Sequence, residues 1–86
     1  MVYLLYNRQT PAERQMADYE KRLKDEQIEA ELVDADSPRG VQLVEHYDVM
    51  GRPAVLLVKG DGAPLGVWQG EDSLPTVAEV GYLTRQ

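Results

Sequence analysis

Two residue types that often carry nucleophilic catalysis or bind transition metals are scarce in this sequence, since cysteine is absent and histidine occurs once. It has no cysteine, which excludes disulfides, thiolate chemistry and cysteine-based metal sites. Its one histidine, His46, stands beside Glu45, with no partner for a catalytic triad and no second histidine for a metal. Asp34 and Asp36 could approach a hard cation, but their spacing lacks the other ligands of a calcium loop. We therefore predict no catalytic residue and no metal site, and we interpret His46 as a surface helix residue.

The composition favours one small acidic domain over residues 1–86. An apolar share of 43% is adequate for a core. Fifteen acidic residues against nine basic ones give a net charge of −6, which disfavours nucleic acid as a partner because its phosphates need a basic surface. No apolar run is long enough to cross a bilayer, and the first six residues lack the basic region and cleavage site of a signal peptide. We expect no membrane partner and a cytoplasmic location.

The element that positions the rest of the chain is expected at Ala54–Val58. These five consecutive apolar residues show no polar alternation, which is typical of a strand covered on both faces. Pro53 precedes them, where its missing N–H is tolerated because it stands at the first position of the strand. Proline lowers the cost of a cis peptide bond to about 0.5–1 kcal/mol, so we predict a cis Arg52–Pro53 bond.

Two of the three expected helices begin with a capping residue followed by proline. Thr10 precedes Pro11, and Glu13 stands where a capping box requires it. Ser37 precedes Pro38 and predicts a second, short helix that ends near Asp48. A closing helix is expected over residues 74–83, with a proline in its first turn. The apolar positions of the first helix form one buried stripe, at Ala12, Met16, Tyr19 and Leu23.

Strand patterns fill the intervals between these helices. We expect strands at residues 2–6, 28–32 and 65–68 in addition to the central one, with the second strand at an edge of the sheet. The order is therefore βαβαββα, an α/β arrangement. A strand–helix–strand start implies a parallel pair with a right-handed crossover, and the last two strands form an antiparallel hairpin. The predicted fold is a four-stranded mixed sheet with helices on both faces.

This order and three motifs resemble the thioredoxin-like superfamily in its short, glutaredoxin-like form. The stretch Tyr47–Lys59 resembles the segment in which a helix end leads through Gly-x-Pro to a buried strand. The stretch Gly70–Leu74 is similar to the glutaredoxin turn that opens the last helix, and Val33–Asp36 is similar to the exit from the second strand. The resemblance covers nearly the whole chain. It implies a thioredoxin-like fold with a cis Pro53 beside the active site.

The active-site motif of that family is replaced in this chain. Thr10-Pro11-Ala12-Glu13 occupies the position of Cys-Pro-x-Cys. Thiol–disulfide exchange needs a thiolate, and a threonine hydroxyl has no accessible anion near neutral pH. We therefore expect a redox-inactive protein, whatever its fold would indicate.

Three functions are compatible with this reading. The first is a module that binds a peptide or protein through main-chain groups beside the cis-proline, or through the edge strand, as in β-augmentation. The second is a decayed glutaredoxin relative with a structural role. The third is a transferase-like domain that binds glutathione, or another small thiol, without a covalent bond and activates it with the hydroxyl of Thr10 or Tyr6. No cofactor other than this glutathione is expected.

The resemblance to glutaredoxins also implies which residues would hold a ligand. Helix N-termini near Thr10 and Asp72 would favour an anion, with Arg8 and Arg52 beside them. Each has a structural alternative: a capping box at Thr10, an N-cap of the last helix at Asp72 or Ser73, a solvated loop at Arg52. Trp68 could be a binding platform, but we favour packing. The candidate ligand-binding residues are Arg8, Thr10, Glu13, Arg52, Pro53, Gly70, Asp72 and Ser73.

Overall fold

The fold is built around strand β3, Ala54–Val58, in this computed structural model, which describes residues 1–85. Gln86, the last residue of the predicted domain, lies outside the described residues. All five residues of β3 are buried, with at most 7% of their surface exposed. An apolar strand of this kind must be covered on both faces, and the helices provide this cover.

The sheet has four strands in the order β2-β1-β3-β4. Strand β1 (Val2–Tyr6) pairs in parallel with β2 (Ala30–Asp34) and antiparallel with β3. Strand β3 pairs antiparallel with β4 (Pro64–Gln69). The mixed sheet, the parallel first pair, the final hairpin and the edge position of the second strand are confirmed.

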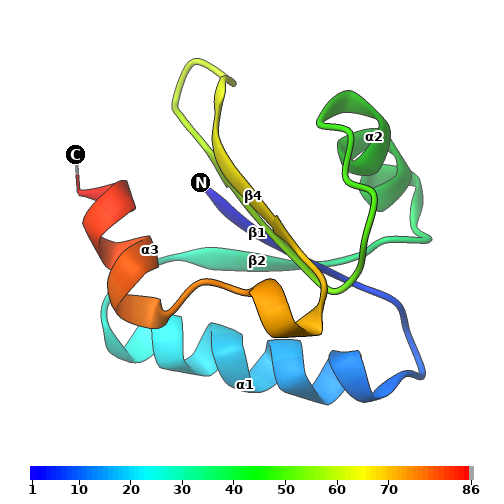
Figure 1. The fold of residues 1–86 in the computed structure, drawn as a ribbon, viewed down its shortest axis with the longest axis horizontal. Helices are drawn as coiled ribbons and strands as arrows, with labels where there is room; N and C mark the ends of the chain where they lie inside the picture. The colour runs from blue at the N-terminus through cyan, green and yellow to red at the C-terminus, as the bar shows by residue number, and fades with distance from the viewer. Residues whose placement is uncertain (86) are drawn as a thin grey trace.

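Helices cover both faces of the sheet. Helices α1 (Pro11–Asp25) and α3 (Val77–Thr84) lie on one side, and α2 (Pro38–His46) lies on the other (Figure 1). The larger core lies on the side of α1, whose buried residues Met16, Tyr19 and Leu23 form the predicted stripe. The smaller core lies under α2. The order βαβαββα is confirmed.

Strand β2 begins two residues after its predicted start. Ile28 lies in the connection after α1 and is held to the end of that helix, because its N–H donates to the carbonyl oxygen of Leu23 at 2.9 Å. Gln27 has a positive φ of 62°, which reverses the chain there. Strand β2 then continues to Asp34, two residues beyond the end predicted from the alternating pattern.

The last helix also begins later than predicted. A short 3₁₀ helix, η1 (Glu71–Ser73), is followed by extended chain, and α3 begins at Val77. Thr76 caps α3, because its hydroxyl accepts the N–H of Glu79 at 3.1 Å. Pro75 is buried before the helix, and its carbonyl oxygen accepts the hydroxyl of Tyr19 at 2.8 Å. The placement of this proline in the first turn of the helix was wrong.

The two cap-then-proline signals have different outcomes. Ser37 caps α2 as predicted, because its Oγ accepts the N–H of Gly40 at 3.0 Å. Thr10 precedes α1, but its side chain makes no capping hydrogen bond. Its hydroxyl instead donates to the carbonyl oxygen of Asn7 at 2.6 Å, and the N–H of Glu13 donates to the main-chain oxygen of Thr10. The predicted capping box is therefore wrong, because the N–H of Glu13 donates to the main-chain oxygen of Thr10 and not to its hydroxyl.

No helix within residues 1–85 is long and apolar enough to cross a membrane.

Candidate functional site

One end of the sheet brings most of the predicted ligand-binding residues into one region. The register pairs Leu5 with Ala54, and Ala54 with Gln69. The last residue of β1 pairs with Asp34, the last residue of β2. The loop after β1, the loop before β3 and the turn after β4 therefore all leave the sheet at this end. They carry Arg8 and Thr10, Arg52 and Pro53, and Gly70, respectively.

The loop before β3, residues Met50–Pro53, is fixed to the end of β4. The peptide bond between Arg52 and Pro53 is cis, and the Pro53 carbonyl oxygen accepts the N–H of Gly70 at 2.9 Å. The side-chain oxygen of Gln69 accepts the N–H of Met50 and, at 2.7 Å, that of Gly51. A Cβ on Gly51 would lie 3.3 Å from Cβ of Gln69, so the two segments are in contact.

Gln69 is a residue of this region that sequence reasoning missed. Its only signal is that it is the polar residue at the end of β4, just before Gly70. Nothing local indicates that its amide holds a loop 18 or 19 residues earlier in the chain.

The same loop presents accessible main-chain groups and one apolar side chain. Arg52 is exposed, and within residues 1–85 its main-chain N–H and C=O form no hydrogen bond. Its guanidinium makes one long contact, 3.4 Å, to the carbonyl oxygen of Val49. Met50 is 83% exposed, which is unusual for a large apolar side chain, and sequence reasoning did not single it out. Pro53 is buried, so it shapes the loop without offering its ring to a ligand.

The polar groups of the loop after β1 are occupied by neighbours. Arg8 Nε lies 3.6 Å from a carboxylate oxygen of Asp34, and Asn7 donates to Asp36 at 3.1 Å. The hydroxyl of Thr10 is used by the carbonyl of Asn7. No group of three metal-binding side chains occurs in the described part of the chain. The polar side chains of this loop therefore contact other residues of the chain, including the predicted ligand-binding residues Arg8 and Thr10.

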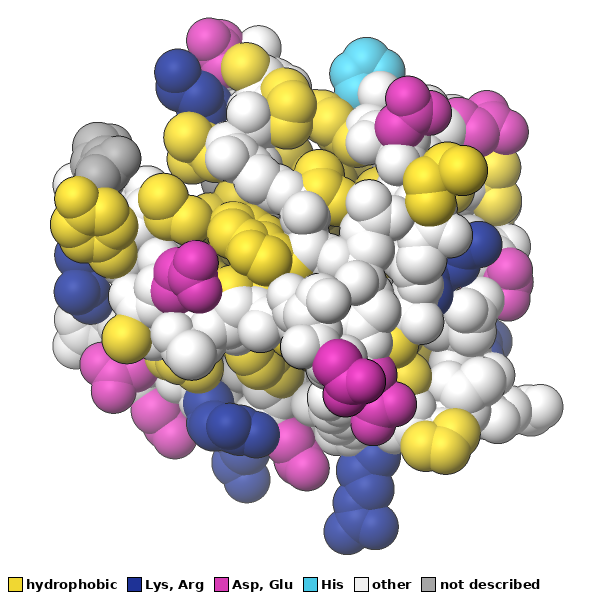
Figure 2. Space-filling model, viewed as in Figure 1, with side chains coloured by type: hydrophobic (Ala, Val, Ile, Leu, Met, Phe, Trp, Pro, Cys, Tyr) yellow, Lys and Arg dark blue, Asp and Glu magenta, His cyan; other side chains and the backbone are white. Residues whose placement is uncertain are grey.

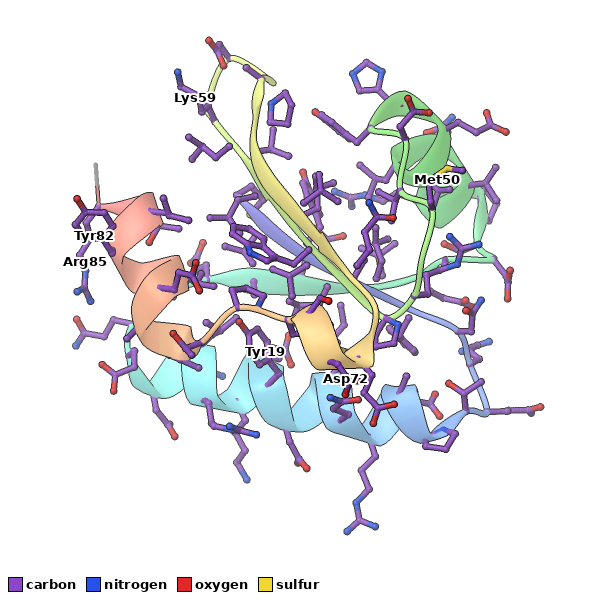
Figure 3. All side chains as sticks on the ribbon, viewed as in Figure 1. Tyr19, Met50, Lys59, Asp72, Tyr82 and Arg85 are labelled. Atoms are coloured by element: carbon purple, nitrogen blue, oxygen red, sulfur yellow. The ribbon has the colours of Figure 1, made fainter. Side chains whose placement is uncertain are left out.

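Asp72 and Ser73 follow Gly70, whose N–H donates to the carbonyl oxygen of Pro53 at the end of the loop that precedes β3. Both are exposed on η1, which is three residues long, and neither caps α3. The N-cap reading was therefore wrong, and no α-helix begins near Asp72 to attract an anion. Figure 3 shows Asp72 well separated from Met50, which lies near α2.

Acidic side chains outnumber basic ones at this end of the sheet. Figure 2 shows acidic side chains over η1, where Figure 3 places Asp72. A ligand with two carboxylates, such as glutathione, would meet repulsion here. The acidic residues of the loops and helix starts at this end are Glu13, Asp34, Asp36, Glu71 and Asp72, against the basic residues Arg8, Arg39 and Arg52.

His46 and Trp68 have structural surroundings. His46 is exposed at the end of α2, and its ring meets that of Tyr47 edge-on, with centroids 4.5 Å apart. Trp68 is half-buried against the larger core. Its indole lies over Gly66, where an added Cβ would come within 2.6 Å of the ring. The preference for packing at Trp68 is confirmed.

The chain is similar to solved thioredoxin structures. Thioredoxin 1 from Thermosipho africanus TCF52B is 13% identical with a TM-score of 0.67, and the match covers 98% of this chain and 89% of that one. A thioredoxin from Thermus thermophilus is 24% identical with a TM-score of 0.59, covering 98% and 70% of the two chains. No protein-family model matches the sequence, and a search of curated proteins gave no match. The chain therefore has the thioredoxin-like fold, as the resemblance implied, without a cysteine.

Proposed function

We propose that this chain is a redox-inactive binding module with a thioredoxin-like fold, which holds an extended peptide segment along Met50–Pro53. The observation that carries the proposal is the open main chain of Arg52 on a loop that Gln69 and Gly70 fix in place. An extended peptide binds to free N–H and C=O groups as an added strand does, and an apolar pocket or side chain beside them gives specificity. Met50 supplies that apolar contact.

The charges at this end of the sheet define the preferred ligand. The surplus of carboxylates favours a neutral or basic peptide over an acidic one. It also disfavours glutathione, and the hydroxyl of Thr10 is already donated to Asn7, so it is not free to donate to a thiolate. The other candidate hydroxyl, that of Tyr6, belongs to a ring packed against the larger core. The proposal therefore favours a peptide ligand over a transferase-like reaction.

The test is a selection of random seven-residue peptides on immobilised wild-type protein, followed by affinity measurements. Met50→Ser should weaken the selected peptides about tenfold to a hundredfold, because burial of a Met side chain contributes about 1.5–3 kcal/mol. Tyr82→Ser is the matched control, since Tyr82 is also a large exposed side chain, 67% exposed, on α3. The Tyr82→Ser variant should bind the selected peptides with the affinity of the wild type.

Two results would overturn the proposal. One is a selection that yields no binder, as expected of a decayed relative kept only for its structure. The other is a set of binders that Met50→Ser and Tyr82→Ser affect equally. A disulfide-reductase assay on the purified chain should also give the buffer rate, because the chain has no thiolate to attack a disulfide.

A further inference from the structure

The outer edge of β2 carries main-chain groups that no strand of the sheet uses. Strand β2 is the last strand on its side of the sheet, and β1 pairs with its inner edge only. The N–H of Ala35 donates to the carbonyl oxygen of Tyr6 at 2.8 Å. Main-chain groups alternate in direction along a strand, so those of Ala30 and Leu32 point away from β1. These two residues offer N–H and C=O groups to a further strand.

This open edge is short and has defined ends. Beyond Leu32, the carbonyl oxygen of Asp34 accepts the hydroxyl of Ser37 at 2.6 Å, as α2 begins. Gly40 packs so tightly there that an added Cβ would lie 2.0 Å from the same oxygen. At the other end, Ile28 is tied back to α1. A docked strand therefore pairs with the edge over a few residues only.

A groove of about 790 Å³ runs along this edge, between β2 and α1. Ala30 and Leu32 form its apolar floor and are only partly buried against the larger core. Its charged lining is mainly acidic, with Glu20, Glu29 and Glu31 against Lys24. Glu31 is already paired with Arg39 at 2.7 Å, which leaves Glu29 as the acidic side chain beside Ala30 that can pair with a partner.

The same charges disfavour a second copy of the chain as the occupant. Two β2 edges that pair would bring Glu29 and Glu31 of each copy close to those of the other, and like charges on paired strands destabilise them. Each copy also carries a net charge of −6. The complementary occupant is an extended segment with basic side chains.

From this geometry we infer a second binding surface, at the outer edge of β2, that takes an extended segment of another protein in which apolar and basic residues alternate. The segment adds a fifth strand by pairing with Ala30 and Leu32. Its apolar side chains lie in the groove beside α1, and its basic side chains, on the opposite face of the sheet, approach Glu29. This surface is distinct from the loop at Met50–Pro53, because β1 separates β2 from β3.

The test uses two synthetic nine-residue peptides on the full chain, one alternating valine with lysine and one alternating valine with glutamate. Binding is measured by fluorescence anisotropy of labelled peptide at low salt, and amide exchange is measured by NMR. We expect the lysine peptide to bind, the glutamate peptide to bind at least tenfold more weakly, and the amides of Ala30 and Leu32 to exchange more slowly when the lysine peptide is bound.

Three variants separate this surface from general charge attraction and from the first proposal. Glu29→Lys should weaken the lysine peptide at least fivefold. Glu45→Lys, an equal charge change at an exposed position on α2, should weaken it less than twofold. Met50→Ser should leave this binding unchanged, so failure of either proposal is seen independently of the other.

Several results would overturn the inference. Equal binding of the two peptides would do so, as would equal losses in Glu29→Lys and Glu45→Lys, or unchanged exchange at Ala30 and Leu32. Concentration-dependent dimers with those two amides protected in the absence of peptide would also overturn it, because the occupant would then be a second copy.

Discussion

Tyr19 is the residue that ties the start of the last helix to the first. Tyr19, labelled in Figure 3, is 7% exposed on α1, and its hydroxyl donates to the carbonyl oxygen of Pro75, 56 residues later. Burial raises the pKa of Tyr19 to about 12, with a smaller contribution from the charge of Glu79. The neutral phenol is therefore the form that the folded protein favours.

The raised pKa predicts how stability changes in alkali. A tyrosine that ionises at about 12 when folded and near 10 when unfolded contributes stability that is complete below pH 10 and declines as the pH rises to 12. Tyr19→Phe should lose about 1 kcal/mol at pH 7, because it lacks the hydrogen bond to Pro75. The gap between wild type and variant should then shrink between pH 10 and 12 in urea unfolding. A constant gap across that range would contradict the assignment.

Ser37 and Thr10 share one local signal and differ in their hydrogen bonds. Ser37→Ala should cost about 1–2 kcal/mol, since the hydroxyl caps α2 and also donates to Asp34. Thr10→Ala should cost less than about 0.5 kcal/mol, since its hydroxyl makes one exposed contact and caps nothing. Urea unfolding of both variants checks the order. Equal losses would mean that Thr10 caps α1 in solution.

At the scale of elements, α2 packs closely against the end of β2 because Gly40 has no side chain. A Cβ at Gly40 would lie 2.0 Å from the Asp34 carbonyl oxygen and 2.8 Å from Cα of Ala35, both main-chain atoms that cannot move freely. Gly40→Ala should therefore destabilise the fold by about 3 kcal/mol or more. Gly60→Ala is the matched control, because nothing lies within 4 Å of its added Cβ. It should stay within about 0.5 kcal/mol of wild type in thermal unfolding.

Elements specified by local pattern were predictable, and those specified by distant contacts were not. Strand β3 follows from five apolar residues, the start of α1 follows from its proline, and the start of α2 follows from a cap and a proline. The start of α3 was missed, because Thr76 caps the helix and Pro75, ahead of it, contacts the distant Tyr19. At the candidate site, Arg52 and Pro53 were found from their motif. Gln69 was missed, because its contacts to the loop appear only once β4 pairs with β3.

At the scale of the whole molecule, we expect repulsion from the net charge of −6 to outweigh the attraction within exposed ion pairs. Within residues 1–85 the ion pairs are Arg8–Asp34 and Arg39–Glu31, and both arginines are more than half exposed. Exposed ion pairs contribute little to stability. In a chain of net charge −6, screening by salt therefore removes more like-charge repulsion than ion-pair attraction.

Salt should therefore stabilise the molecule. Raising sodium chloride from 10 to 200 mM (about 30 Å to about 7 Å in Debye length) should raise the melting temperature by on the order of 3 °C. Glu45→Lys reduces the net charge by two, from −6 to −4, and should reduce this increase. Calorimetry at the two salt concentrations measures both effects. A melting temperature that falls with salt would show that the two ion pairs matter more than the repulsion.

The indole of Trp68 on Gly66 gives the chain a spectroscopic reporter at a defined place. Trp68 is the single tryptophan, so tryptophan fluorescence excited at wavelengths that tyrosine does not absorb comes from β4. There the indole ring packs against the larger core. Strands β4 and β2 are opposite edges of the sheet. Intrinsic fluorescence will therefore follow the loss of the packed core during unfolding. Binding of a ligand at the β2 edge should leave this fluorescence unchanged, so it must be followed by a label on the ligand.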